Sequence, residues 1–317
     1  FYRWAQCCPK AVPDAYDAPR VIAVGDLHSD SFGTWRDTEG RLAWGVDDFD
    51  DAYPLPYTND LIRLATSLKI ARDGGLIDMK LRRACDTILD GYTSTLRDGG
   101  CPMVFAEEHE HLEKLGIDVI RPAHQFWRKL EDRPPVRHMP PSARRALEAL
   151  LPRQLDGTKF VRREAGLGSL GQPRFVLIAQ SEGGAVAREV KALIPSSCVW
   201  AYSRSSQRQP YYERAMSRAV RSHDPFQRVI GQWIVRRLSP DSNPIELANL
   251  GAKRDELRLI RAMGAEAANV HLGSRTRMRA VLADLRRRPS DWLHAAAKTM
   301  AKLVEDEWNS YRSERDG

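Results

Sequence analysis

The chain has 317 residues, enough for one large domain or two lobes, and its apolar content of 42% and charged content of 29% are ordinary for a globular protein. It contains no run of roughly 18 apolar residues, which excludes a membrane-spanning helix and argues against a membrane partner. The net charge is +7, but the basic residues are scattered along helical stretches without interleaved aromatic residues, so we expect a solvated surface and no nucleic-acid partner.

The first predicted strands lie in an acidic segment. Val21–Val24 and Leu42–Val46 are apolar runs, and each is followed by carboxylates. Residues 21–60 contain nine acidic and two basic side chains, in contrast to the positive charge of the whole chain. Carboxylates crowded at strand ends repel each other unless a cation lies between them. We therefore expect a strand–loop–strand hairpin that brings Asp26 and Asp48 together at a divalent-metal site.

Helical patterns follow this segment. Thr58–Asp60 has the composition of a helix N-cap, and apolar residues at helical spacing come directly after it. A second helix is expected over residues 80–96, ended by the Gly99–Gly100 pair. Further helices between residues 107 and 151 are interrupted by prolines, which indicates a domain boundary near residue 152.

From Thr158 the pattern is typical of strands. Two strands flank a glycine-rich turn, and the SEGG sequence at 181–184 predicts a hairpin into a third strand. A helical stretch at 211–220 precedes another hairpin, and two helical regions follow from Arg254 onward.

This order predicts an α+β fold in three ranges. Residues 1–152 would form part of a helical lobe that carries the acidic loops. Residues 153–246 would form a small lobe with an antiparallel sheet, and residues 247–317 would complete the helical lobe.

The five cysteines lack the spacing of metal ligands, and we expect reduced thiols in a cytoplasmic protein. The chain opens on FYRW without a methionine, which indicates a fragment of a longer protein. The opening also lacks the basic start and apolar core of a signal peptide.

The glycine-rich turn matches G-x-G-x-x-G between two strands. A dinucleotide-binding site would need a helix after the turn, whereas strand–turn–strand is the protein-kinase arrangement, with backbone N–H groups over nucleotide phosphates. The expected phosphate-binding residues of the turn are Gly166, Gly168, Ser169 and Gly171. Lys191 on the next strand is the expected lysine ligand of the phosphates, and Glu213 is the carboxylate expected to orient it. Glu189 departs from the kinase pattern, which has a small residue beside the base at that position.

Kinase-like transfer also needs a catalytic aspartate, an asparagine five residues later and a metal-binding aspartate in D-F-G. Asp26 matches the catalytic base, and Ser31 stands at the asparagine position. Asp48 and Asp50 flank Phe49 in the equivalent of D-F-G, so the expected Mg²⁺ ligands are Asp48, Asp50 and Ser31. The glycine-rich turn begins about 140 residues after Asp26, which is the inverse of the usual order and indicates a circular permutation.

The G-D-L-H and D-F-x motifs, followed by N-D-L at a helix start, resemble aminoglycoside phosphotransferases. More of the chain resembles a bacterial family, the domain of unknown function 2252. The motifs that carry this resemblance are GDLHSDSFGTW, EGRLAWGVDDFDDAYPLPYTNDLIRLA, AGLGSLGQPRFV, AREVKAL, WIVRRL and MGAEAANVHLGS. The resemblance implies a kinase-like fold in permuted order, without an established substrate. The resemblance to aminoglycoside phosphotransferases implies that Asp60 is a structural residue bracing the catalytic loop, a role that is compatible with an N-cap.

The resemblance to the domain of unknown function 2252 implies site positions at Asp26, Asp48, the three glycines of the turn and Lys191. The family usually reads G-D-x-H-x-x-N-F-G, so Ser31 replaces an asparagine with a shorter, weaker ligand. The family's N-D-F-D is also D-D-F-D here, where Asp47 adds a carboxylate.

The sequence therefore predicts an ATP- and Mg²⁺-dependent phosphotransferase with a small-molecule or protein acceptor that is not identified. Ser31 and Glu189 favour an alternative, a weak or inactive pseudokinase-type module that binds nucleotide. A second alternative is a metal-dependent phosphoesterase, in which Asp26 and His28 of the G-D-x-H motif would bind two metals. The later G-N-H and G-H-x-H motifs of that class are absent from the sequence. We therefore expect His28 to brace its loop and His271 to face the core.

Overall fold

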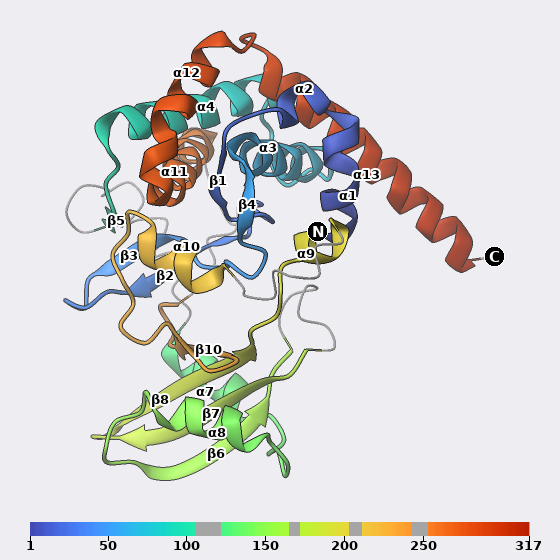
Figure 1. Cartoon of the computed structure of the whole chain (residues 1–317). Helices are drawn as coiled ribbons and strands as arrows, with labels where there is room; N and C mark the ends of the chain where they lie inside the picture. The colour runs from blue at the N-terminus through green and yellow to red at the C-terminus, as the bar shows by residue number, and fades with distance from the viewer. Residues whose placement is uncertain (106–121, 165–171, 203–210, 243–252, 317) are drawn as a thin grey trace.

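The computed structural model describes residues 1–105, 122–164, 172–202, 211–242 and 253–316 (Figure 1). The helices are α1 (Tyr2–Ala11), α2 (Pro13–Tyr16), α3 (Tyr57–Asp73), α4 (Leu81–Asp98), α7 (Ala123–Glu131), α8 (Pro141–Glu148), α9 (Ser197–Ala201), α10 (Tyr212–Arg218), α11 (Lys253–His271), α12 (Met278–Arg287) and α13 (Trp292–Asp316). The strands are β1 (Arg20–Ala23), β2 (Phe32–Arg36), β3 (Leu42–Val46), β4 (Tyr53–Pro56), β5 (Met103–Val104), β6 (Asp156–Arg162), β7 (Arg174–Ser181), β8 (Gly184–Ala192), β9 (Arg228–Ile230) and β10 (Trp233–Leu238). The predicted α+β class is confirmed.

The largest sheet is antiparallel and has the strand order β6–β7–β8–β10–β9. Glu182 and Gly183 both have positive φ, at 49° and 79°, which fits the tight turn predicted between β7 and β8. Side chains alternate between the two faces of the sheet. Phe175, Leu177 and Val190 share a buried cluster with residues of α8, whereas Val176 and Ile178 share one with Leu130 of α7.

The two strands predicted in the acidic segment both form, but the predicted hairpin between them was wrong. β1 pairs antiparallel with β4, and β3 pairs with β2 and β5. The reason is Phe32–Arg36, a short strand without clear apolar alternation, whose backbone occupies the pairing edge of β3. The other partner, Tyr53–Pro56, contains two prolines, a composition that rarely indicates a strand.

The helical part of the molecule is organised around α4 and α11, which lie side by side (Figure 1). Each helix carries a glycine where the two backbones meet. A Cβ added at Gly91 would lie 2.1 Å from Arg261 O, and one added at Gly264 would lie 2.3 Å from Ile88 O. The close approach of these helices therefore depends on the absence of side chains at both positions. No helix of the described ranges is long and apolar enough to cross a bilayer.

The predicted division into three ranges stays a prediction. α8 lies just before the predicted boundary at residue 152, and it packs against the sheet through Ala143 and Leu147. α10 follows the first three strands of the sheet in the chain, but Tyr212 and Ala215 on this helix belong to the large helical core. All five cysteines are free thiols.

Candidate functional site

The loop that carries Asp26 is held by the first turns of α3. Val24 N and Gly25 N donate to the two oxygens of Asp60, at 2.7 and 3.0 Å, and Asn59 Nδ2 donates to Gly25 O at 2.9 Å. The predicted N-cap role of this segment was wrong, because α3 begins at Tyr57 and Pro56 occupies the cap position. Asp60 instead braces the loop that carries Asp26, as the resemblance to aminoglycoside phosphotransferases implied.

A buried network extends from Asp60 into the core. His271 Nε2 lies 3.0 Å from Asp60 Oδ2, and His271 Nδ1 lies 2.7 Å from the hydroxyl of Tyr92. All three residues are fully buried. A neutral His271 with its proton on Nε2 satisfies both contacts, since it donates to Asp60 and accepts from Tyr92. His271 faces the core as expected, and it also fixes the carboxylate that holds the loop.

Asp26 itself is partly exposed, and an arginine of α3 orients it. Arg63 Nε donates to Asp26 Oδ1 at 2.7 Å. The guanidinium of Arg63 also lies over the ring of Trp4, 5.2 Å from its centroid. Sequence reasoning missed Arg63, although it lies one turn after Asp60 and therefore on the same side of the helix.

Ser31 closes the loop that begins at Asp26. Its hydroxyl donates to Asp26 O at 3.1 Å and accepts from His28 N at 3.0 Å. These bonds use the hydroxyl proton and one lone pair, so the predicted metal-ligand role of Ser31 depends on its second lone pair. His28 Nδ1 accepts from Asp30 N at 3.2 Å. Burial lowers the pKa of His28, and Asp26 opposes this effect.

Lys191 of β8 contacts two carboxylates of the acidic loop that follows β3. Lys191 Nζ lies 2.6 Å from Asp50 Oδ1 and 3.3 Å from Asp48 Oδ1. The Lys191 side chain is buried, whereas 54% of the Asp48 side chain is exposed. Burial and the adjacent Asp48 raise the pKa of Asp50 to about 6. Burial alone would lower the pKa of Lys191, but the two carboxylates raise it above its usual value.

Contacts at both ends fix the position of this loop. At one end, Val46 N donates to Glu266 Oε1 at 3.2 Å, and Arg221 donates to Val46 O at 2.9 Å. At the other end, Asp51 Oδ1 accepts from Ser197 N, the first residue of α9, at 2.7 Å. Asp48 and Asp50 are therefore presented from a loop anchored on two helical segments.

The remaining predicted residues are Glu213 and the residues of the glycine-rich turn. Glu213 is exposed on α10, and the carboxylates beside Lys191 are Asp48 and Asp50. Tyr212, the neighbour of Glu213, faces Lys191 with its ring centroid 5.8 Å from Nζ. The predicted residues of the glycine-rich turn, Gly166, Gly168, Ser169 and Gly171, lie outside the described residues.

Glu189, the departure from the kinase pattern, lies at the centre of an arginine cluster. Its Oε1 accepts from Arg236 Nε at 2.7 Å and from Arg174 NH1 at 3.3 Å, and its Oε2 accepts from Arg163 NH1 at 2.5 Å. The arginines hold the pKa of this fully buried carboxyl far below its usual value, against the effect of burial. The cluster was not predicted, because its members meet only through strand register: Arg236 is the cross-strand partner of Glu189, and Arg174 is that of Lys191.

The donor set at Asp48 and Asp50 fits Mg²⁺. Mg²⁺ binds through one or two carboxylates together with water and phosphate oxygens. The two carboxylates already contact one cationic group, the ammonium of Lys191. In the described ranges, no three His, Cys, Asp or Glu side chains are gathered as a metal-ligand set. A metal at this site would therefore take its other ligands from water or substrate.

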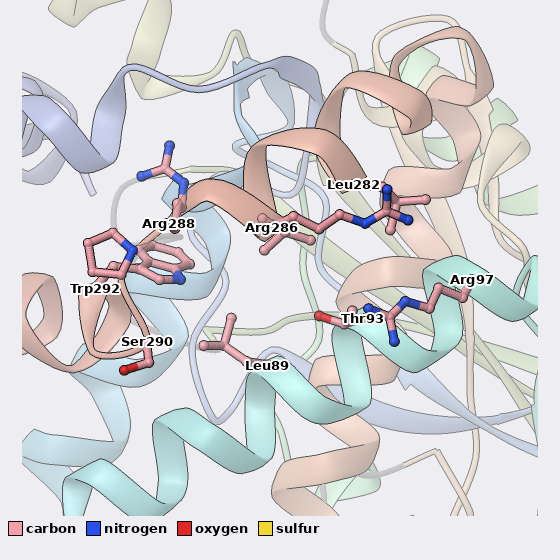
Figure 2. Close-up of a pocket in the computed structure, with 10 residues that line it drawn as sticks. Leu89, Thr93, Arg97, Leu282, Arg286, Arg288, Ser290 and Trp292 are labelled. Atoms are coloured by element: carbon pink, nitrogen blue, oxygen red, sulfur yellow. The ribbon is translucent and has the colours of Figure 1, made fainter.

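A cavity of about 160 Å³ lies elsewhere, between α4 and α12 (Figure 2). It is lined by Leu89, Thr93, Arg97, Leu282, Leu285, Arg286, Arg288, Pro289, Ser290 and Trp292. Arg288 is bound to Asp284 and to the hydroxyl of Tyr57. None of the predicted site residues lines this cavity, so it is separate from the site around Lys191.

The fold and site thus define an α+β protein with a lysine–aspartate ion pair between a sheet and an acidic loop. The model of one family, described as "Uncharacterized protein conserved in bacteria (DUF2252)", matches residues 10–125, a little over a third of the chain. The match covers the loops with Asp26, Asp48 and Asp50. Comparisons with curated proteins and with solved structures gave no match.

Proposed function

We propose that the protein is an ATP- and Mg²⁺-dependent phosphotransferase of the kinase-like class, with its catalytic segment ahead of the glycine-rich turn in the chain. The observation that carries this proposal is the contact of Lys191 with Asp48 and Asp50. Lys191 and Asp48 are 143 positions apart, and each belongs to a motif that phosphoryl transfer uses. A buried lysine next to carboxylates also suits a site for Mg²⁺ and phosphate together.

Each side chain has a role in this proposal. Asp26 accepts the proton of the attacking hydroxyl, and Arg63 orients its carboxylate. Asp48 is the principal ligand of Mg²⁺ because its side chain is the more exposed, and Asp50 assists it. Lys191 binds phosphate oxygens. When bound, Mg²⁺ would neutralise the charge on the transferring phosphate.

The acceptor is a small molecule or a protein, and its pocket belongs to the helical part. We also infer that the whole chain belongs to the bacterial DUF2252 family, since its resemblance to that family continues beyond residue 125 in AREVKAL, WIVRRL and MGAEAANVHLGS. We place the protein in the cytoplasm because its five cysteines are free thiols.

Calorimetric titration with ATP, with and without Mg²⁺, tests the proposal. Asp48→Asn should lower Mg²⁺-dependent ATP affinity at least about tenfold, because a charged ligand is lost, while urea unfolding stays cooperative. Asp86→Asn, on the exposed surface of α4, is the charge-matched control and should leave affinity unchanged. If wild-type protein does not bind ATP, the proposal is wrong. ATP binding without consumption, over a panel of metabolite acceptors, would support the pseudokinase-type alternative.

A further inference from the structure

One face of the sheet beside Lys191 carries a cluster of arginines that the roles above do not use. Along this face Glu189 and Lys191 alternate with inward-facing residues of β8, and Arg236 and Arg174 approach from the two neighbouring strands. Arg163, directly after β6, completes the cluster. In the kinase pattern the position of Glu189, two residues before the lysine, adjoins the nucleobase and holds a small apolar residue. A buried carboxylate with three guanidinium groups leaves little apolar surface on which a base could stack.

The exposure of these side chains indicates which of them a ligand can reach. Glu189 is fully buried, whereas the side chains of Arg163 and Arg236 are 26% and 24% exposed. Arg174 is 6% exposed, and within the described part of the chain its Nε has no hydrogen-bond partner. A buried donor without a partner is costly, and an anionic oxygen is the group that best satisfies an arginine N–H.

Among the residues that the structure describes, the charged side chains of the site pair with one another. The cations are Arg163, Arg174, Arg236 and Lys191, and the carboxylates are Glu189, Asp47, Asp48 and Asp50. If Mg²⁺ engages Asp48 and Asp50, as the proposed function requires, Lys191 loses its two partners. The cations on the sheet face then exceed their remaining carboxylates by two. A bound polyanion would restore the balance.

We propose that this arginine-lined face binds a polyphosphate chain, which runs from Lys191 over β8, between Arg236 of β10 on one side and Arg163 after β6 on the other, and that the nucleobase lies elsewhere. Arginine suits this role because its planar fork binds phosphate oxygens in pairs. The identification of the polyphosphate as that of a nucleotide rests on the proposed function. The anion site itself rests on the arginine cluster, and only the charge argument for it assumes Mg²⁺ at Asp48 and Asp50.

The probe is inorganic tripolyphosphate, titrated into the full chain by calorimetry in the presence of Mg²⁺, with adenosine as the competitor. Arg163→Gln should weaken tripolyphosphate binding at least about tenfold, because it removes a charged phosphate contact. Arg162→Gln is the matched control, because the neighbouring side chain is exposed and points to the other face of β6. Saturating adenosine should not displace tripolyphosphate.

A second variant separates an anion site from a merely structural cluster. Glu189→Gln keeps the size of the side chain but removes the carboxylate that competes for the arginines, so tripolyphosphate should bind several-fold more tightly. A structural cluster would show weaker or unchanged binding. If Glu189→Gln fails to unfold cooperatively, the comparison of the Arg163 and Arg162 variants decides.

The results also separate this inference from the proposed function. Equal affinities for the Arg163 and Arg162 variants, or displacement by adenosine, would overturn the inference and leave an Asp48-dependent ATP site intact. Arginine-dependent tripolyphosphate binding without ATP binding would support the anion site and contradict the nucleotide function. If wild-type protein binds neither probe, both are wrong.

Discussion

Glu266 should give the protein a pH-dependent stability that one substitution removes. This residue is 1% exposed, and its carboxyl accepts hydrogen bonds from Val46 N at 3.2 Å and Asn269 Nδ2 at 2.9 Å. Burial raises its pKa from 4.5 to about 7, although the contact with Asn269 and the charge of Arg221 act in the opposite direction. The folded state therefore holds this proton more tightly than the unfolded state. The resulting stabilisation is complete below pH 4.5 and is lost as the pH rises through about 7.

The size of the effect follows from the two pKa values. At roughly 1.4 kcal/mol per pH unit between them, the unfolding free energy should fall by about 3 kcal/mol in total, most of it between about pH 5 and pH 8. Glu266→Gln is neutral throughout this range. Urea unfolding of both proteins should show the wild type losing about 2 to 3 kcal/mol relative to the variant as the pH rises from about 5 to 8.

If the difference in unfolding free energy between the wild type and Glu266→Gln stays constant as the pH rises, or grows in favour of the wild type, this reasoning is wrong. Such a result would mean that Arg221 and the two N–H donors keep the carboxylate ionised despite burial. Glu148→Gln, at an exposed position on α8, is the control and should show no comparable slope. Glu266 accepts a hydrogen bond from Val46 N at the start of the acidic loop. A change in the protonation of Glu266 should therefore also affect the backbone position of Asp48 and Asp50.

Two further substitutions test the scaffold. Asp60→Asn places an amide N–H₂ against donors such as Val24 N and Gly25 N, and should lower the unfolding free energy by about 3 kcal/mol in urea titrations; a loss below about 1 kcal/mol would contradict the bracing role. Gly264→Ala places a methyl group 2.3 Å from Ile88 O and should cost about 1 to 3 kcal/mol, seen as a lower melting temperature in calorimetry. An unchanged melting temperature would show that α4 and α11 can separate without loss.

Elements with strong periodicity could be predicted from the sequence. The spacing of Leu81, Cys85, Ile88 and Tyr92 predicted a helix over residues 80–96, and α4 spans Leu81–Asp98 with all four buried. The left-handed Gly99 at its end explains why the boundary was also accurate. The SEGG hairpin could also be predicted, because the residues of a tight turn determine its conformation locally.

Strand pairing in the acidic segment could not be predicted from the sequence in the same way. Apolar alternation identifies a strand but not its partner, and β4 carries prolines at 54 and 56. Those prolines are tolerated because, in the described part of the chain, β4 pairs with β1 alone in a two-stranded sheet. The hairpin error therefore arose from pairing the two strands that were recognised, when each had a partner with weak strand character.

The candidate site was predictable in its acidic residues and lysine, but not in the groups that hold them. Charge density identified Asp26, Asp48 and Asp50, and distance from the glycine-rich turn identified Lys191. Arg63, and the arginines around Glu189, become neighbours of the site only through helix geometry or strand register. From the sequence, Glu189 was interpreted as a departure from the kinase pattern, because the sequence does not show that arginines neutralise its charge.

The two networks that join the site to the fold differ in how readily a ligand could open them. The network of Asp60, His271 and Tyr92 is fully buried and hydrogen-bonded, so breaking it would leave the ring nitrogens of His271 and the hydroxyl of Tyr92 without these partners inside the core. The contact of Lys191 with Asp48 is different, because half of the Asp48 side chain is in solvent, where an ion pair contributes little. Solvent can therefore compete with Lys191 for Asp48 without disturbing the loop, whose ends are held elsewhere. The Asp60 network that holds the Asp26 loop is thus scaffold, whereas the contact of Lys191 with Asp48 is the part that a ligand can exchange.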